Sequence, residues 1–201
     1  MAKHNILFIA VDDLRPSIGC YGDRHAITPN LDRLAKRGVR FAQAHCQVAV
    51  CNPSRASLMT GLRPDTLGVW TLPIHFREAK PNAVTLPQWL RKHGYTAVGH
   101  GKIYHNPTPD PQSWSEPIRP VQSQRGYAKG WQARIREVQA KLPANDWRKN
   151  NLRGPATAAP VIDDHKLVDG ARTNLAIEDL RRLGQGEKPF FLALGFIRPH
   201  L

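Results

Sequence analysis

The chain has few cysteines, few acidic residues and no long apolar run. Three of its 201 residues are cysteines, Cys20, Cys46 and Cys51, and this odd, sparse set does not suit a disulfide framework. His45, Cys46 and Cys51 lie close in sequence, but no second pair at metal-binding spacing supports a zinc cluster. No apolar stretch is long enough for a membrane span, and no internal repeat of fixed period is present. The length suits one ordinary domain with a sizeable core.

The scarcity of acidic residues leaves the chain strongly basic. It has 16 Asp and Glu against 29 Lys and Arg, a formal net charge of +13. Residues 119–153 hold nine of the basic residues and two acids. This charge would attract a polyanion, and a solvated basic face explains it equally well. Nucleic acid is the alternative partner from another functional class, but no recognised nucleic-acid motif supports it, so we expect none.

Residues 105–160 differ in composition from the rest of the chain. They carry eight of the 17 prolines and three of the five tryptophans. We predict that this segment is an irregular basic insertion over the strand ends, where substrate-selecting loops normally lie.

Short apolar runs alternate with amphipathic segments along the rest of the chain. Runs of this length are typical of strands buried on both faces, and the amphipathic segments are typical of helices. This alternation predicts an α/β fold with a largely parallel central sheet flanked by helices. The expected strands are 5–11, 39–42, 95–98 and 190–195, and the expected helices are 28–36, one starting at 53, 85–93 and 169–183.

Two adjacent carboxylates, Asp12 and Asp13, follow the first apolar run directly. The carboxyl ends of parallel strands are where open α/β sheets usually place ligands. Carboxylate oxygens suit hard cations such as calcium or magnesium better than zinc. A polar turn after a strand is the simpler explanation for the pair taken alone.

A second cluster of polar residues begins at Cys51 and reads Cys-Asn-Pro-Ser-Arg as far as Arg55. Pro53 suits the first position of a helix, because its missing N–H would have no partner there. Cys51 is therefore expected just ahead of a helix N-terminus, which attracts anions such as sulfate. Arg55 adds a planar fork of donors one turn later. Taken alone, the motif also fits a buried cysteine beside an ordinary helix start.

Together these motifs resemble the signature of the sulfatase family, within the alkaline phosphatase superfamily. The resemblance is greatest to the iduronate-2-sulfatase branch and its bacterial relatives. It implies an alkaline-phosphatase-like sandwich in which a formylglycine-generating enzyme oxidises Cys51 to formylglycine, an aldehyde that acts as its hydrate. It also implies that Asp12, Asp13 and residue 51 bind a divalent cation, Ca²⁺ or alternatively Mg²⁺.

The resemblance extends to Lys102, His105 and His200. The segment Gly101-Lys102-Ile103-Tyr104-His105 matches a family G-K-x-x-H motif, and His200 matches a family histidine at the substrate sulfate. Taken singly, each fits a solvated lysine or a loop histidine. The resemblance implies that Lys102 stabilises the transferring sulfate together with Arg55. It further implies that His200 or Lys102 protonates the leaving group and that His105 accepts a proton.

The expected activity is hydrolysis of a sulfate ester on a sulfated sugar or glycosaminoglycan. Phosphate or phosphonate ester hydrolysis is the alternative, because the same superfamily also handles those substrates. The resemblance covers only the N-terminal part of the family and lacks its second pair of metal ligands and a later lysine. We therefore expect residues 1–201 alone to be inactive. The Asp-His pair within 163–165 is interpreted as a loop, not as the missing ligands.

The N-terminus leads directly into the first apolar run, and Asp12 and Asp13 interrupt any signal-peptide core. As written, the chain is expected in the cytoplasm. If an N-terminal signal has been lost, it is expected in the periplasm or outside the cell. The sequence leaves the oligomeric state and the natural substrate open.

Overall fold

The computed structural model describes residues 3–105, 109–123, 130–152, 154, 159 and 161–200. The chain divides into two compact units. The first combines Met1–Arg119 with Leu175–Leu201, and the second is Pro120–Asn174. Each unit is described by itself below.

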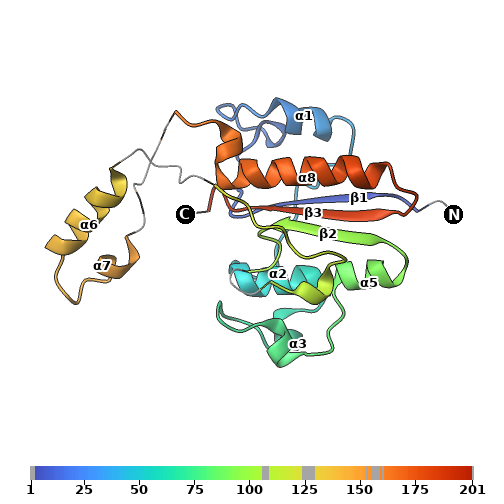
Figure 1. Ribbon diagram of the computed structural model, residues 1–201, viewed down its shortest axis with the longest axis horizontal. Coiled ribbons are helices and arrows are strands. Elements are labelled where there is room, and N and C mark those ends of the chain that lie inside the picture. Colours follow the sequence, from blue (N-terminus) through green and yellow to red (C-terminus); the bar gives the residue numbers. More distant parts are fainter. Residues whose placement is uncertain are drawn as a thin grey trace. The chain divides into compact units, whose positions relative to one another are not determined.

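A parallel sheet of three strands forms the centre of the first unit (Figure 1). It consists of β1 (Ile6–Val11), β2 (Thr96–Gly101) and β3 (Phe190–Phe196), in the order β1-β3-β2. β3 pairs with β1 from Ile6 opposite Phe191, and with β2 from Thr96 opposite Phe190. The central strand is therefore the last one in sequence, and all three carboxyl ends lie at the same edge.

The central strand is buried on both faces, which explains its continuous apolar run. Phe191 and Ala193 belong to the main core cluster, together with side chains from α2 (Cys51–Thr60) and α5 (Leu86–Lys92). Phe190 and Leu192 point to the other face and pack with Leu183 of α8 (Val168–Gly184). Successive side chains along a strand alternate in this way between two helix-covered faces.

Helices flank both faces of this sheet, as Figure 1 shows for α8 on one side and α2 and α5 on the other. Thr85 and Gln88 form a capping box at the start of α5, and Gly61 closes α2 with a φ of 70°, a conformation that glycine adopts without strain. α8 starts in the second unit and ends in the first, and the other helical elements of the first unit are short. The bounds are η1 Gly19–Tyr21, α1 Pro29–Ala35, α2 Cys51–Thr60, α3 Pro64–Leu67, α4 Phe76–Ala79, α5 Leu86–Lys92, η2 Pro111–Ser113 and α8 Val168–Gly184.

The second unit contains α6 (Trp131–Lys141), α7 (Arg148–Asn151) and η3 (Asp164–Lys166), followed by the start of α8. Much of the predicted insertion falls in this unit, while its first residues up to Arg119 belong to the first unit. Part of the insertion is helical, because α6 has half-buried apolar side chains at Ile135 and Val138, three residues apart.

The predicted α/β class with a parallel sheet is confirmed, but two local predictions need correction. Residues 39–42 form no strand, because Val39 and Phe41 are exposed and pair with none of the three described strands. α2 starts at Cys51 rather than at Pro53, so Pro53 occupies the third helical position, where an N–H also lacks a partner. Residues 164–166, in the stretch interpreted as a loop, form a short 3₁₀ turn. Among the described residues no helix is long and apolar enough to span a membrane.

Candidate active site at the strand ends

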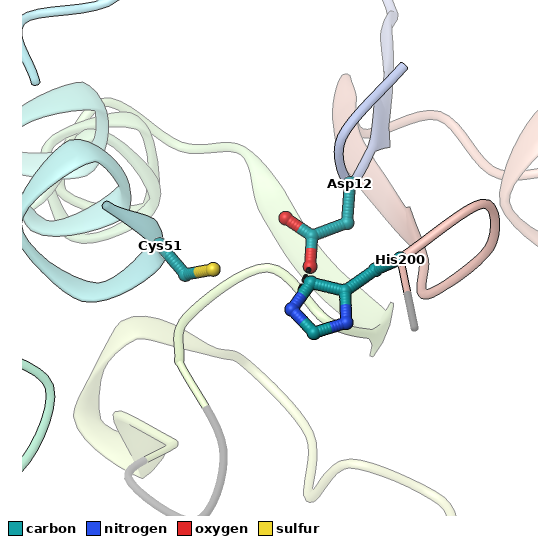
Figure 2. Close-up of side chains that lie close together, drawn as sticks. All are labelled: Asp12, Cys51 and His200. Carbon is teal, nitrogen blue, oxygen red and sulfur yellow. Dashed lines mark ion pairs between the residues drawn. The ribbon is translucent and has the colours of Figure 1, made fainter. Parts of the chain in front are cut away.

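Four of the predicted site residues meet where the three parallel strands end. Asp12 follows β1, Lys102 follows β2 and His200 lies four residues beyond β3. Cys51 begins α2, whose N-terminus faces the same edge of the sheet. Figure 2 shows Asp12 and His200 close together, with the Cys51 thiol pointing toward them. The potential ligand atoms of Asp12, Cys51 and His200 lie within 4.8 Å of one another.

The Asp12 carboxylate is the point on which the charges of this site converge. Its Oδ1 accepts a hydrogen bond of 2.7 Å from Arg55 Nη2, and its Oδ2 accepts one from Lys102 Nζ. All three side chains are buried. Burial alone would raise the pKa of Asp12, but the hydrogen bonds and positive charges of Lys102 and Arg55 outweigh it and lower that pKa. Asp12 is therefore an anion held between two cations.

Arg55 connects α2 with the loop that follows β2. Its Nη1 donates to the backbone carbonyls of Lys102 and Ile103, the second at 3.2 Å. Its Nε–H is buried and has no hydrogen-bond partner among the described residues. A buried donor without a partner costs free energy, so this group suits an oxygen of a bound ligand.

His200 lies between the two aspartates. Its Nε2 is 3.9 Å from a carboxylate oxygen of Asp12 and 3.9 Å from one of Asp13. Asp13 itself is mostly exposed and has a φ of 57°, in the left-handed region that Asp tolerates better than most residues. This turn directs the two consecutive carboxylates to different surroundings, one buried and one open to solvent.

His105 completes the set of predicted residues. Burial, followed by the positive charges of Lys102 and Arg55, lowers the pKa of its imidazole below the usual 6.5. The nearby Asp12 charge acts in the opposite direction but does not prevail. His105 is therefore a neutral base at neutral pH, unlike the two cations beside it.

Gly195 contributes to the site but was missed in the sequence analysis. A Cβ at this position in β3 would fall on the backbone of Lys102, which donates its N–H to the Gly195 carbonyl at 2.9 Å. The absence of a side chain lets Lys102 approach closely enough to reach Asp12. A glycine inside a buried strand is the sequence signal for such a close approach.

The donor set fits the first half of a site for a hard divalent cation. Asp12 and Asp13 supply carboxylate oxygens, which calcium prefers. A cysteine sulfur at position 51 does not suit calcium, whereas an oxygen at that position would. His200 is the third member of the ligand group around Asp12, although imidazole is not a typical calcium ligand.

The fold and the site together define an α/β protein with a cluster of buried charged side chains at its strand ends. The family model "Sulfatase" matches residues 4–201. The chain therefore belongs to the sulfatase family.

Curated relatives agree with this assignment. "Iduronate 2-sulfatase" of Mus musculus is 38% identical over 204 residues, which cover 98% of this chain and 35% of the relative. The protein of the same name from Homo sapiens is 37% identical, with the same coverage. A "Sulfatase" of Formosa agariphila is 35% identical and covers 99% of this chain and 39% of its own length. The chain thus spans about a third of the length of these relatives.

Solved structures share the fold over nearly the whole chain. Phosphonate monoester hydrolase of Agrobacterium radiobacter superposes with a TM-score of 0.64 at 25% identity, covering 99% of this chain and 42% of its own. BT1596, described as a 2-O GAG sulfatase, gives a TM-score of 0.62 at 25% identity, with 99% and 36% coverage. These neighbours confirm the predicted alkaline-phosphatase-like architecture. The individual roles of the site residues remain predictions.

Proposed function

We propose that the protein containing this chain hydrolyses sulfate esters. The observation that carries the proposal is the convergence of Arg55, Lys102 and Cys51 on the buried Asp12 carboxylate, with a buried Arg55 Nε–H that has no partner among the described residues. A sulfate group offers oxygens to such donors. Positive charge held in a buried site stabilises negative charge on a transferring group far better than charge in water does.

Residue 51 would provide the nucleophile, and the two aspartates would hold the cation. A formylglycine formed from Cys51 would supply a hydroxyl as its hydrate, and Asp12, Asp13 and an oxygen of residue 51 would hold Ca²⁺, which would neutralise negative charge. Mg²⁺ suits the same carboxylates.

The chain's own side chains orient sulfate and move protons. Arg55 and Lys102 bind the sulfate oxygens and hold them against the N-terminus of α2. His200 or Lys102 donates a proton to the departing sugar alcohol. His105 accepts a proton from the hydroxyl at position 51, a role that its lowered pKa favours because its imidazole is neutral at neutral pH.

The proposed substrate class is a sulfated sugar, in particular a glycosaminoglycan. Relatives named for iduronate 2-sulfatase and a neighbour described as a 2-O GAG sulfatase support this class. The net charge of +13 would attract such a polyanion. Phosphonate or phosphate ester hydrolysis is the second candidate, because a phosphonate monoester hydrolase is among the structural neighbours. Turnover of matched aryl sulfate and aryl phosphate substrates distinguishes the two activities.

The conversion of Cys51 can be tested directly by mass spectrometry. The chain is produced together with a formylglycine-generating enzyme, and the tryptic peptide that ends at Arg55 is probed with a carbonyl-reactive hydrazide. This peptide also contains Cys46, so Cys51→Ala and Cys46→Ala serve as matched variants. We expect a lighter, hydrazide-reactive peptide that persists in Cys46→Ala and disappears in Cys51→Ala. A free thiol at Cys51 under these conditions would refute the formylglycine mechanism.

A further inference from the structure

A cavity of about 680 Å³ opens at the start of β2, at the opposite end of that strand from the site around Asp12. Its lining includes the cations Arg91, Lys92 and Lys188 and the hydroxyl-bearing residues Tyr95, Thr96 and Ser115. The volume falls within the range of small-molecule sites. β2 has six residues, so roughly 20 Å of strand separates the two places.

The cavity has an excess of positive charge. Within the described part of the chain no Asp or Glu lines it, and Arg91, Lys92 and Lys188 take part in no ion pair with another described residue. Lys3 adds a fourth cation at the rim, where its ammonium lies 5.9 Å from the centre of the Tyr95 ring. Like charges gathered in one concave surface repel each other, and a bound anion relieves that repulsion.

The favourable interaction of cations with the C-terminal end of the α5 dipole does not explain why so many cations gather here. Arg91 and Lys92 lie in its last turn, where cations complement the helix dipole, and Lys3 donates to the carbonyl of His93 beside them. The dipole is equivalent to only about half an elementary charge. Four cations exceed it several times over, and Lys188 reaches the cavity from the segment before β3 rather than from the helix.

Neutral groups beside the cations indicate what kind of anion fits. Ser115 is fixed against the outer edge of β2, because its N–H donates to Ala97 at 2.8 Å and its Oγ accepts from the Ala97 N–H at 3.0 Å. The Ser115 hydroxyl retains its own proton to donate. Thr96 and Tyr95 add two more hydroxyls, and the Tyr95 ring adds an apolar surface. An acidic sugar combines a charged group with hydroxyls and apolar C–H faces in this way.

We propose that this cavity binds a sulfate or carboxylate group of an acidic oligosaccharide, at a distance from the strand-end site. The binding needs neither formylglycine nor a divalent cation, and it therefore goes beyond the proposed hydrolysis. A long acidic glycan could contact both places, while a short one would occupy the cavity alone.

Titration of the 201-residue chain by NMR and calorimetry tests the proposal. The probes are a sulfated glycosaminoglycan tetrasaccharide, its desulfated and carboxyl-reduced counterpart, and inorganic sulfate. We expect the sulfated probe to shift the Thr96 and Ser115 amides, and the neutral probe and inorganic sulfate to bind about ten-fold more weakly or worse. Equal affinity for inorganic sulfate would reduce the cavity to a simple anion site and overturn the assignment to an oligosaccharide.

Charge-reversal variants locate the binding. Arg91→Glu with Lys188→Glu should weaken the sulfated probe about ten-fold or more, whereas Lys36→Glu with Arg37→Glu makes the same change in net charge outside the cavity and should have much less effect. Equal losses in the two variants would overturn the proposal, as would equal binding of an oligonucleotide of matched charge.

Circular dichroism checks that these variants fold. If the double Glu variant unfolds, Arg91→Met with Lys188→Met removes the charge and keeps the aliphatic stems, and undiminished binding to that variant also overturns the proposal.

Discussion

Arg55 uses its guanidinium to join an acid, two backbone carbonyls and an open donor. It binds Asp12 through Nη2 and the carbonyls of Lys102 and Ile103 through Nη1, which leaves Nε for a ligand. A lysine at position 55 keeps the positive charge but has no planar fork, and so it cannot serve these partners at once. The geometry thus gives the arginine a role that charge alone does not fill.

We therefore predict that Arg55→Lys lowers kcat for an aryl sulfate by roughly ten- to a thousandfold, the range for losing one preorganised donor. The measurement uses formylglycine-bearing protein extended to the length of the curated relatives. Circular dichroism should show a much smaller loss of folded protein than of activity. Arg63→Lys, at an exposed position just before α3, is the matched control and should retain wild-type activity. Equal activity of Arg55→Lys and wild type would remove the proposed role.

Gly195 is a residue where a single methyl group should matter. The Cβ of Gly195→Ala would overlap the backbone of Lys102, which lies in the next strand's continuation and cannot rotate away. Overpacking of this kind costs about 1–3 kcal/mol. We predict that loss in the free energy of unfolding, measured by urea denaturation of the chain. Gly184→Ala is the control, because an added Cβ there meets no atom within 4 Å, and its stability should not fall.

At the scale of elements, Arg77 of α4 is hydrogen-bonded to Asp110 just before η2 and to Gln88 of α5 at 2.8 Å, and this network reaches the loop that carries Lys102 and His105. The Asp110 carboxylate accepts from Arg77 Nε at 2.5 Å and from Nη2 at 2.7 Å, and it also accepts from Ser113 at 2.6 Å. Ser113 Oγ in turn lies 2.6 Å from the hydroxyl of Tyr104, between Ile103 and His105 in sequence. Through Ser113 and Tyr104, the buried pair is therefore connected to the loop that carries Lys102 and His105.

We predict that Asp110→Ala destabilises the fold by about 3–5 kcal/mol, because it leaves the Arg77 charge nearly buried and unpaired. Urea denaturation measures the loss. Asp163→Ala removes a carboxylate from an exposed pair with Lys166 and should change stability little, since solvent screens such pairs. The double variant Arg77→Met with Asp110→Leu removes both charges and should recover part of the loss. Similar stability of Asp110→Ala and wild type would contradict the supporting role of the pair.

The Arg77–Asp110 pair and the cluster around Asp179 lead to a prediction of how the free energy of unfolding depends on pH. Asp179 is buried and accepts from His100 at 2.7 Å, from Arg119 at 2.9 Å and from Arg182 at 2.8 Å. Burial raises the pKa of Asp110 and of Asp179, but hydrogen bonds from their cationic partners outweigh it and lower both below the usual 3.8. A depressed pKa means that the unfolded chain binds more protons than the folded one as the pH falls.

We therefore expect the contribution of these two carboxylates to be complete above pH 3.8 and to be lost as the pH falls through their lower folded pKa values. Urea midpoints measured from neutral to acidic pH should fall steeply at the acid end. Asp110→Ala should show a shallower fall, because it lacks one of the two groups. If the urea midpoint of Asp110→Ala falls with pH as steeply as that of the wild type, Asp110 does not contribute to the acid dependence of stability.

The elements that the sequence predicted well are those whose signal is local. Runs of apolar residues identified β1 and β3, and Asp12 and His200 could be placed at a shared edge because parallel strands end together. Residues 39–42 show the limit of predicting strands from sequence patterns, because an alternation of apolar and polar side chains does not show whether a neighbouring strand is available for pairing. Gly195 and Asp110 escaped prediction for a related reason, since their roles depend on contacts with residues far away in sequence.

At the scale of the whole molecule, the described sheet has two outer strands, and one of them is poorly covered. β1 pairs with β3 along one edge, and its side chains Leu7 and Ile9 are 49% and 50% exposed. Exposed apolar strands at a sheet edge favour association with other chains. Because the relatives are about three times as long as the stretch that matches, we expect residues beyond that stretch to cover β1 in proteins of their length.

The same comparison of lengths leads to a prediction about calcium. Asp12, Asp13 and one oxygen at residue 51 supply about half of the six to eight oxygens that Ca²⁺ prefers, and Asp12 already shares its charge with Arg55 and Lys102. We therefore predict weak calcium binding by residues 1–201 and no measurable aryl-sulfate hydrolysis, even after conversion of Cys51.

Calorimetric calcium titration and a sulfatase assay test this prediction on formylglycine-bearing protein. The same chain extended to the length of the curated relatives is the positive control and should bind calcium tightly and turn over substrate. Asp12→Asn in the extended chain should weaken calcium binding, because it removes the negative charge at the centre of the site. Tight stoichiometric binding with turnover by residues 1–201 alone would show that the described strand ends already hold a complete site, and that the ligands expected beyond this stretch are not needed.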